Sequence, residues 1–409
     1  MHFWSLAVSA TVLQAVNLGL PLLFTLALVK IYALEEFGLY STLFSIVAIL
    51  SALAEYGLPT HGLSKIQALR DPTAKAKMFV AITQTKLVTS SLTFPIYLMV
   101  ASFLIGSRLS VVGILCGYPY ILGVALNSSW FLYAESKLPA LLVSSLTIRT
   151  GSIIVLLLVS RFANNIEVAI ALNSISFLLV GFWSTWIGLR VSQRTFKNLL
   201  DFSHTHREIK ENLKQSGPLS LSNIFVVFYT SINVILVSNV ISIAAAGIIG
   251  VAERVVRAGQ TILSGMTTAG LASASRHTDR ERRTVLGWQI TMHALSGVLV
   301  YLSSSLIVRA LGTNLDPLAI DVLRIYSWVL AIGGVSSVLN THYFVRTGKY
   351  RIQTIIVFGG CLLNVPLVYI LAVRFGTLGA AAGVAAVETL VLSLTLAFAA
   401  MHRSAPDER

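Results

Sequence analysis

The sequence contains little charge, and this excludes an ordinary soluble fold. Only 11% of its 409 residues are Asp, Glu, Lys or Arg, whereas 55% are hydrophobic. A soluble domain carries about 25% charged residues. The mean hydropathy is +0.79 over the whole length. Most of the chain is therefore expected to lie in lipid.

Other features that would indicate an enzyme or a metalloprotein are also missing. The two cysteines, Cys116 and Cys361, lie in apolar runs and have neither a disulfide framework nor metal-ligand spacing. No GxxxxGK[ST] motif is present, so direct use of ATP is not expected. The predicted outer loops are too short for the chemistry of a membrane-bound polymerase or ligase. We therefore expect neither an enzyme nor a bound metal or cofactor.

Long apolar runs recur along the whole chain. A segment of about 20 apolar residues is long enough to cross a bilayer as a helix. Twelve such runs lie near residues 8–29, 40–60, 79–101, 111–133, 140–160, 168–189, 217–238, 245–272, 285–308, 319–344, 353–373 and 378–400. The sequence therefore predicts an all-α integral membrane protein with about twelve transmembrane helices.

The net charge of +13 is distributed unevenly over the predicted loops. If loops alternate between two sides, the side of both termini carries 21 of the 30 Lys and Arg residues and the opposite side carries 5. Cytoplasmic loops carry this excess of cations. We therefore expect both termini in the cytoplasm, and the charge indicates contact with membrane lipids rather than with nucleic acid.

The second half of the chain weakly repeats the first. Val29–Tyr40 aligns with Ser238–Ile249 at an offset of 209, and Asn127 aligns with Asn340 at an offset of 213. Two halves of six spans in the same orientation predict a parallel pseudo-repeat, with the substrate path between the halves. The expected lobes are 1–190 and 217–401, joined by a basic cytoplasmic linker at 191–216 and followed by a tail at 402–409.

One predicted span, near Gly247–Gly270, contains Glu253, Arg254 and Arg257. Charges at membrane depth cost several kcal/mol each and usually mark functional sites. Glu253 and Arg257 are four residues apart, so they share a helix face and can pair. The face continues through polar residues and favours a hydrated cavity. The alternative is an ion pair that only locks two helices together.

Two further ionisable residues lie near the middle of their predicted spans. Arg149 needs a carboxylate partner or an anionic ligand at that depth. Glu388 is a candidate partner for Arg149, Arg254 or Arg257.

For the remaining candidate residues, the sequence supports a structural role as well as a functional one. Gln14 and Asn17 lie on one polar stripe, which suits either a cavity wall or hydrogen bonds between helices. Glu55 lies near the end of its span and could be a cap, a snorkelling side chain or a protonation site. Asp321 and Arg324 are three apart, which predicts a local pair first and an outer gate second.

Several stretches, taken in order, resemble one family. They are Glu36–Tyr40, Glu55–Leu58, Trp130–Lys137, Val251–Arg257 and Phe375–Ala381 with Glu388. Together they are similar to the Wzx-type polysaccharide-unit flippases of the multidrug/oligosaccharidyl-lipid/polysaccharide exporter superfamily. One departure is Leu271–Arg276, which lacks the proline that the family often has there.

The resemblance implies a specific function. Such proteins move an undecaprenyl-diphosphate-linked oligosaccharide, which is an O-antigen, exopolysaccharide or capsule repeat unit, across the bacterial inner membrane by alternating access. An anionic, polar headgroup needs a hydrated cavity with cations at depth, so we expect Arg149, Arg254, Arg257, Gln14 and Asn17 to bind the substrate. Glu253, Glu388 and Glu55 are the candidates for ion coupling or ion pairing. The protein partners that the resemblance implies are a polysaccharide polymerase and a chain-length regulator.

Three other functions remain open from the sequence. An ion-coupled small-molecule or drug antiporter of the same superfamily would rely on carboxylates in an apolar cavity, whereas deep arginines favour an anionic substrate. A lipid II flippase usually has fourteen spans rather than twelve. An integral-membrane enzyme of a glycan pathway would need a large outer loop.

Overall fold

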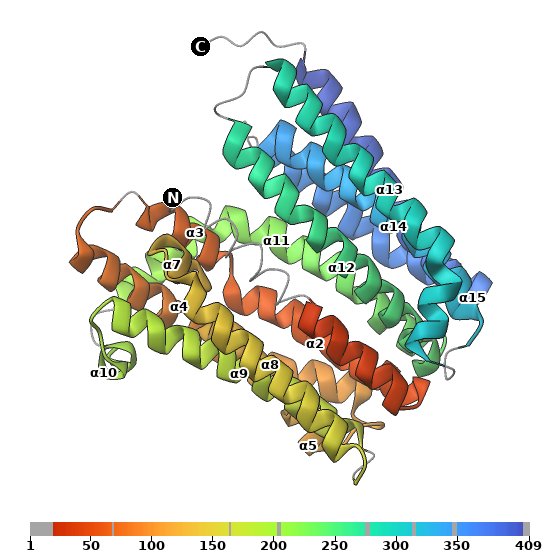
Figure 1. Ribbon diagram of the computed structural model, residues 1–409, viewed down its shortest axis with the longest axis horizontal. Helices are drawn as coiled ribbons and strands as arrows, with labels where there is room; N and C mark the ends of the chain where they lie inside the picture. Colours follow the sequence, from red (N-terminus) through yellow and green to blue (C-terminus); the bar gives the residue numbers. More distant parts are fainter. Residues whose placement is uncertain are drawn as a thin grey trace. The chain divides into compact units, whose positions relative to one another are not determined.

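The computed structural model describes residues 19–67, 69–162, 165–202, 206–274, 279–312, 316–345 and 350–403. Within these ranges the regular elements are all helical and no strand occurs (Figure 1). The all-α membrane fold expected from hydropathy is therefore confirmed. Gln14 and Asn17 lie outside the described residues.

The first half of the chain is a series of long helices interrupted by short ones. After a helix described over Gly19–Ile31, the elements are α2 (Leu34–Glu55), α3 (Leu58–Ile66), α4 (Pro72–Ile105), α5 (Val111–Leu115), α6 (Tyr118–Leu126), α7 (Ser129–Ala134), α8 (Leu138–Val159), α9 (Ile166–Val191) and α10 (Phe196–Leu200). The predicted span at 111–133 is thus three short helices, because the helix is broken before Tyr118 and again at Asn127.

The second half consists mainly of longer helices. They are α11 (His206–Val240), α12 (Ile243–Ala274), α13 (Asp279–Leu311), α14 (Leu318–Asn340), the π-helix η1 (Thr341–Val345) and α15 (Tyr350–Arg403) (Figure 1). α14 packs against both α13 and α15.

Nine helical stretches of the described chain are long and apolar enough to cross a membrane. One of them, Arg351–Met401, spans 51 residues, which is enough for two crossings. α12 is not among the nine, and it is the helix that carries Glu253, Arg254 and Arg257. The chain is a multi-pass membrane protein, and the count of twelve spans stays a prediction.

α15 folds back on itself at Gly376. This residue has φ 62° and ψ −146°, a conformation open essentially to glycine. An added Cβ at Gly383 would lie 3.0 Å from Val368 Cα, and one at Gly360 would lie 2.7 Å from Val391 Cγ2. These pairs are symmetric about Gly376, so the two arms run antiparallel. They correspond to the two spans predicted at 353–373 and 378–400.

Replacing Gly376 by alanine is expected to destabilise this hairpin by about 1–3 kcal/mol, because alanine is strained in that conformation. No atom lies within 4 Å of the added Cβ, so the cost is conformational only. Gly359→Ala is the matched control, since it lies inside the same helix with equally open surroundings. Thermal unfolding in detergent measures the melting temperature of both variants. An equal decrease in the two variants would contradict a turn at Gly376.

The chain divides into two compact units. The first contains Leu39–Val227 and the chain up to Tyr32, and the second contains Ala33–Gly38 and the chain from Phe228. The boundaries fall within α2 and within α11. The lobe limits predicted at 190 and 217 stay a prediction.

Glycines allow the helices of the first unit to pack closely. An added Cβ at Gly181 of α9 would overlap the carbonyl oxygen of Gly123 of α6. Small residues at such contacts let membrane helices approach through their backbones. Phe79 of α4 and Phe131 of α7 stack nearby, with ring centroids 4.4 Å apart, in the core of this unit.

Candidate functional site

The predicted pair on α12 forms, and α11 supports it. Arg257 Nη2 lies 3.3 Å from Glu253 Oε2. The same nitrogen donates hydrogen bonds of 3.1 Å to Thr230 O and Ser231 Oγ of α11. The Arg257 side chain is 44% exposed, whereas that of Glu253 is 10% exposed. The carboxylate is therefore buried, and the arginine side chain is held by these contacts while almost half of it remains exposed.

A second polar group lies near the Glu253 carboxylate. The hydroxyl of Tyr326 on α14 is buried in the electrostatic field of Glu253 and Arg257. Within the described residues, neither this hydroxyl nor Glu253 Oε1 has a hydrogen-bond partner. Buried polar groups are normally paired. The arrangement is thus suited to a polar ligand or to rearrangement. The sequence alone did not indicate Tyr326, because only the packing of α14 against α12 brings its hydroxyl near Glu253.

Arg254 makes a different kind of contact. Its guanidinium carbon lies 4.9 Å from the ring centroid of Phe37, which is fully buried in the first turn of α2. A cation over an aromatic face is stabilised by the ring quadrupole. Gly38 makes room for this contact, since an added Cβ there would overlap Ile243 O at the start of α12. Phe37 and Gly38 of the Glu36–Tyr40 motif therefore pack against α12.

Glu388 of α15 is buried and accepts a hydrogen bond of 3.1 Å from the Tyr229 hydroxyl of α11. The carbonyl of Tyr229 in turn accepts from the side-chain amides of Asn233 and Asn364. Gly333 of α14 also approaches Glu388, with an added Cβ 3.2 Å from its Oε2. The carboxylate is thus held by a tyrosine and amide network that the sequence pattern did not predict.

Arg149 lies in the first unit, on α8, and is buried. Its guanidinium carbon is 4.1 Å from the ring centroid of Phe177 on α9. The ring of Tyr120 contacts the same phenylalanine, at 3.9 Å between centroids. An aromatic stack therefore helps to hold this deep cation.

Glu55 ends α2 and faces Lys86 of α4. Lys86 Nζ lies 3.8 Å from Glu55 Oε1 and donates a 2.8 Å hydrogen bond to Asn127 O. The Lys86 side chain is only 1% exposed. The ammonium is thus directed inward, to the break between α6 and α7.

Asp321 and Arg324 form the predicted local pair near the start of α14. Arg324 Nη1 donates to Asp321 Oδ1 at 3.0 Å, and the two side chains are 45% and 55% exposed respectively. A role as an outer gate stays a prediction.

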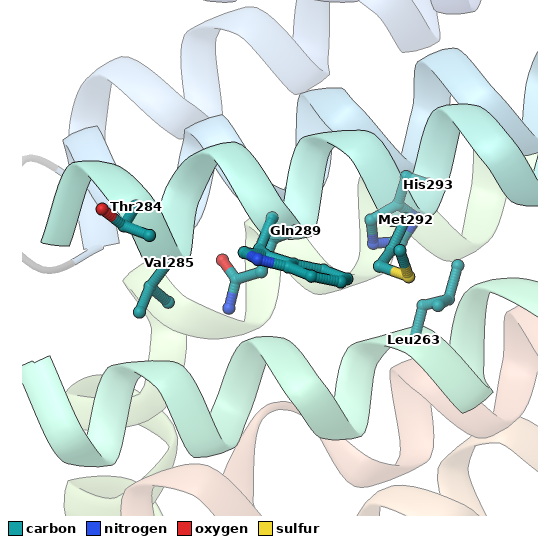
Figure 2. Close-up of a pocket in the computed structure, with 7 residues that line it drawn as sticks. Leu263, Thr284, Val285, Gln289, Met292 and His293 are labelled. Carbon is teal, nitrogen blue, oxygen red and sulfur yellow. The ribbon is translucent and has the colours of Figure 1, made fainter. Parts of the chain in front are cut away.

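A pocket of about 220 Å³ lies between α12 and α13, and Figure 2 shows its lining. The lining is mainly apolar and consists of Leu263, Thr284, Val285, Trp288, Gln289, Met292 and His293. None of the predicted charged residues lines it. His293 is buried, and Gly334 of α14 makes room for its ring.

A family model and a known protein both match this chain. The family model described as "Polysaccharide biosynthesis protein" matches residues 4–272. A Shigella dysenteriae protein named "Putative O-antigen transporter" is 22% identical over 379 residues, which are 90% of this chain and 92% of that protein.

Solved structures of membrane transporters share the fold. An inward-facing multidrug resistance MATE family transporter of the MOP superfamily has a TM-score of 0.76 at 14% identity, with 96% of this chain and 94% of that chain covered. The lipid II flippase MurJ in an inward closed conformation has a TM-score of 0.68 at 15% identity, with 97% and 87% covered.

Proposed function

We infer the function from one premise: this chain belongs to the polysaccharide biosynthesis protein family, whose model matches residues 4–272. It is a flippase for a lipid-linked oligosaccharide. The Shigella dysenteriae relative, named for O-antigen transport, supports a glycan cargo. The likeness to the lipid II flippase supports a fold that can host such a cargo.

The observation that carries the proposal is the state of Arg257. One end of its guanidinium is anchored by Glu253, Thr230 and Ser231, while the side chain remains 44% exposed. Lipid-linked oligosaccharides carry phosphate groups next to the lipid. A planar guanidinium matches phosphate oxygens in a bidentate way, and an anchored guanidinium loses less entropy on binding. Arg257 is thus suited to hold the phosphate end of the cargo.

Arg149 is a second proposed phosphate contact. It is buried in the first unit over Phe177, and the buried position strengthens any ionic contact that it makes. Arg254 is the third, although its guanidinium packs on Phe37. Gln14 and Asn17 stay proposed sugar or phosphate contacts, and they lie outside the described residues.

The cargo, the mechanism, the orientation and the partners are proposed as well. The cargo is an undecaprenyl-diphosphate-linked repeat unit, moved by alternating access in the bacterial inner membrane, with both termini in the cytoplasm. Coupling to an ion gradient assigns Glu253, Glu388 and Glu55 to ion exchange. A polysaccharide polymerase and a chain-length regulator are the proposed protein partners.

Transport in proteoliposomes tests the proposal directly. Purified protein is expected to move a fluorescent lipid-diphosphate oligosaccharide between leaflets faster than protein-free vesicles do, with the cargo recovered chemically unchanged. The matched control is the same oligosaccharide on an uncharged lipid, which is expected to move no faster than in empty vesicles. Gradients of pH and sodium are collapsed separately and together to find the coupling ion.

Three results would contradict this function. The first is equal movement of the charged and uncharged glycolipids, since an arginine site must distinguish them. The second is efflux of a cationic dye with no movement of the glycolipid, which would indicate a drug antiporter. Cleavage or extension of the glycan would indicate an enzyme instead.

A further inference from the structure

Lys86 is a buried cation that the proposed function does not use. It lies in the fifteenth position of the 34-residue helix α4, and its side chain is only 1% exposed. An ammonium at such a position is costly unless it is paired, and it is usually functional in membrane helices. The described contacts of this group all belong to the first unit.

The ammonium contacts a break in a membrane helix. α6 ends at Leu126 and α7 begins at Ser129, with Asn127 in an extended conformation between them. Such a break leaves carbonyls without helical partners, and these must be satisfied inside the membrane. Hydroxyls of Ser184 and Thr185 on α9 donate to Leu126 O. Asn127 O instead accepts its hydrogen bond from Lys86 at 2.8 Å.

The counter-charge of Lys86 is loosely placed and partly exposed. Glu55 Oε1 lies 3.8 Å from Lys86 Nζ, beyond hydrogen-bond distance, and the Glu55 side chain is 31% exposed. An ammonium has three N–H donors. Among the described residues, one of them donates the 2.8 Å hydrogen bond to Asn127 O. Burial disfavours the charged amine and the carboxylate favours it, so the charge of Lys86 depends on the position of Glu55.

Few other groups influence this amine. Glu55 is the charged group whose electrostatic effect on Lys86 is evident among the described residues. The broken helix contributes a carbonyl, and the Tyr118 hydroxyl of α6 is directed to Ser90 O, one turn further along α4. Protonation of Lys86 therefore depends mainly on Glu55 and on the position of the break.

We propose that Lys86, Glu55 and Asn127 form a proton-controlled clamp. The ammonium holds the α6–α7 break against the end of α2. When an N–H bond of Lys86 breaks, the proton passes to the Glu55 carboxylate as an O–H bond and then to water. The pair changes from neutral to a net charge of −1. The neutral amine no longer holds Asn127 O as a charged donor, and the break is released.

This clamp deepens the proposed function by naming the proton as the coupling ion, and in that step it rests on the proposed function. The clamp itself can be measured without transport. Hydrogen–deuterium exchange of residues 127–132 in detergent, corrected for the pH dependence of intrinsic exchange, reports whether the break is held.

Wild-type protein is expected to lose protection at 127–132 in one transition as the pH rises. Lys86→Arg keeps a cation at every pH, so it is expected to stay protected, whereas Lys86→Met is expected to be unprotected throughout. Lys75→Met is the matched control, because Lys75 lies on the same helix and forms a 2.8 Å pair with Glu135 near the end of α7. It is expected to leave the transition unchanged.

A pH-independent wild type, or a Lys86→Arg variant with the wild-type transition, would overturn the clamp. If both Lys86 variants fail to fold, Glu55→Gln decides. Without the Glu55 carboxylate the Lys86 ammonium is less favoured, so protection at 127–132 is expected to be lost at lower pH. An unchanged transition in Glu55→Gln would also overturn the proposal. A wild-type protein that shows the exchange transition but does not move the glycolipid would instead contradict the proposed function and not the clamp.

Discussion

Replacing Arg257 by alanine is expected to reduce glycolipid flipping by about tenfold to a hundredfold. The change removes charge-assisted hydrogen bonds to phosphate, each worth about 1.5–3 kcal/mol, and each 1.4 kcal/mol is a factor of ten. It also leaves the buried Glu253 carboxylate without the cation that lies 3.3 Å away. Initial flipping rates in proteoliposomes, normalised to folded protein, measure the effect.

Lys75→Ala is the matched control for Arg257→Ala. The Lys75 side chain is 27% exposed and pairs at 2.8 Å with Glu135, which is 25% exposed, and neither residue is a proposed phosphate contact. Its loss is expected to change the rate less than twofold, because exposed pairs contribute about 0–1 kcal/mol. Equal losses in both variants would show that Arg257 acts through general surface charge, not through a phosphate site.

Two further variants test the proposed phosphate contacts. Arg257→Lys keeps the charge but lacks the planar fork, so an intermediate rate is expected. Arg149→Ala removes a cation from the first unit and is expected to reduce transport as well. Wild-type rates in both Arg257→Ala and Arg149→Ala would remove the site assignment while leaving the fold unaffected.

Replacing Gly181 by leucine is expected to prevent folding of the first unit. The new side chain would meet the backbone carbonyl of Gly123, which cannot move as a side chain can. Overpacking costs about 1–3 kcal/mol even where side chains adjust, and more is expected here because two helix backbones must separate. The yield of monodisperse protein in detergent and its thermal unfolding provide the measurement.

Gly151→Leu provides the comparison for this variant. Gly151 lies within α8, and no atom approaches an added Cβ within 4 Å. Its replacement is expected to leave the yield close to that of the wild type. Similar yields and melting temperatures for the two leucine variants would refute close backbone packing between α6 and α9.

The fold was largely predictable because one physical quantity, the length of apolar runs, determines where a chain can cross a bilayer. Even the hairpin inside α15 appeared as two runs on either side of Gly376. The break at Asn127 was not predicted, since the backbone groups that it exposes are satisfied by hydroxyls of α9, far away in the sequence.

The candidate site was predicted where partners lie on the same helix and not where they lie on different ones. Glu253 and Arg257 are four residues apart, so their pairing follows from helix geometry. Tyr229 as the partner of Glu388 required knowledge of how α11 and α15 pack. The hydrogen bond of Lys86 to Asn127 O could not be predicted either, because the acceptor lies at a helix break that the apolar run at 111–133 does not reveal.

The turn at Gly376 bears on how the protein is made. The two arms of α15 pack against each other within the same segment, and the turn between them has almost no loop. During synthesis such a pair can enter the bilayer together, and little more than the turn must be translocated. Arg374 lies next to that turn and Glu388 lies within the second arm, so the desolvation of both charges opposes insertion of the last two arms.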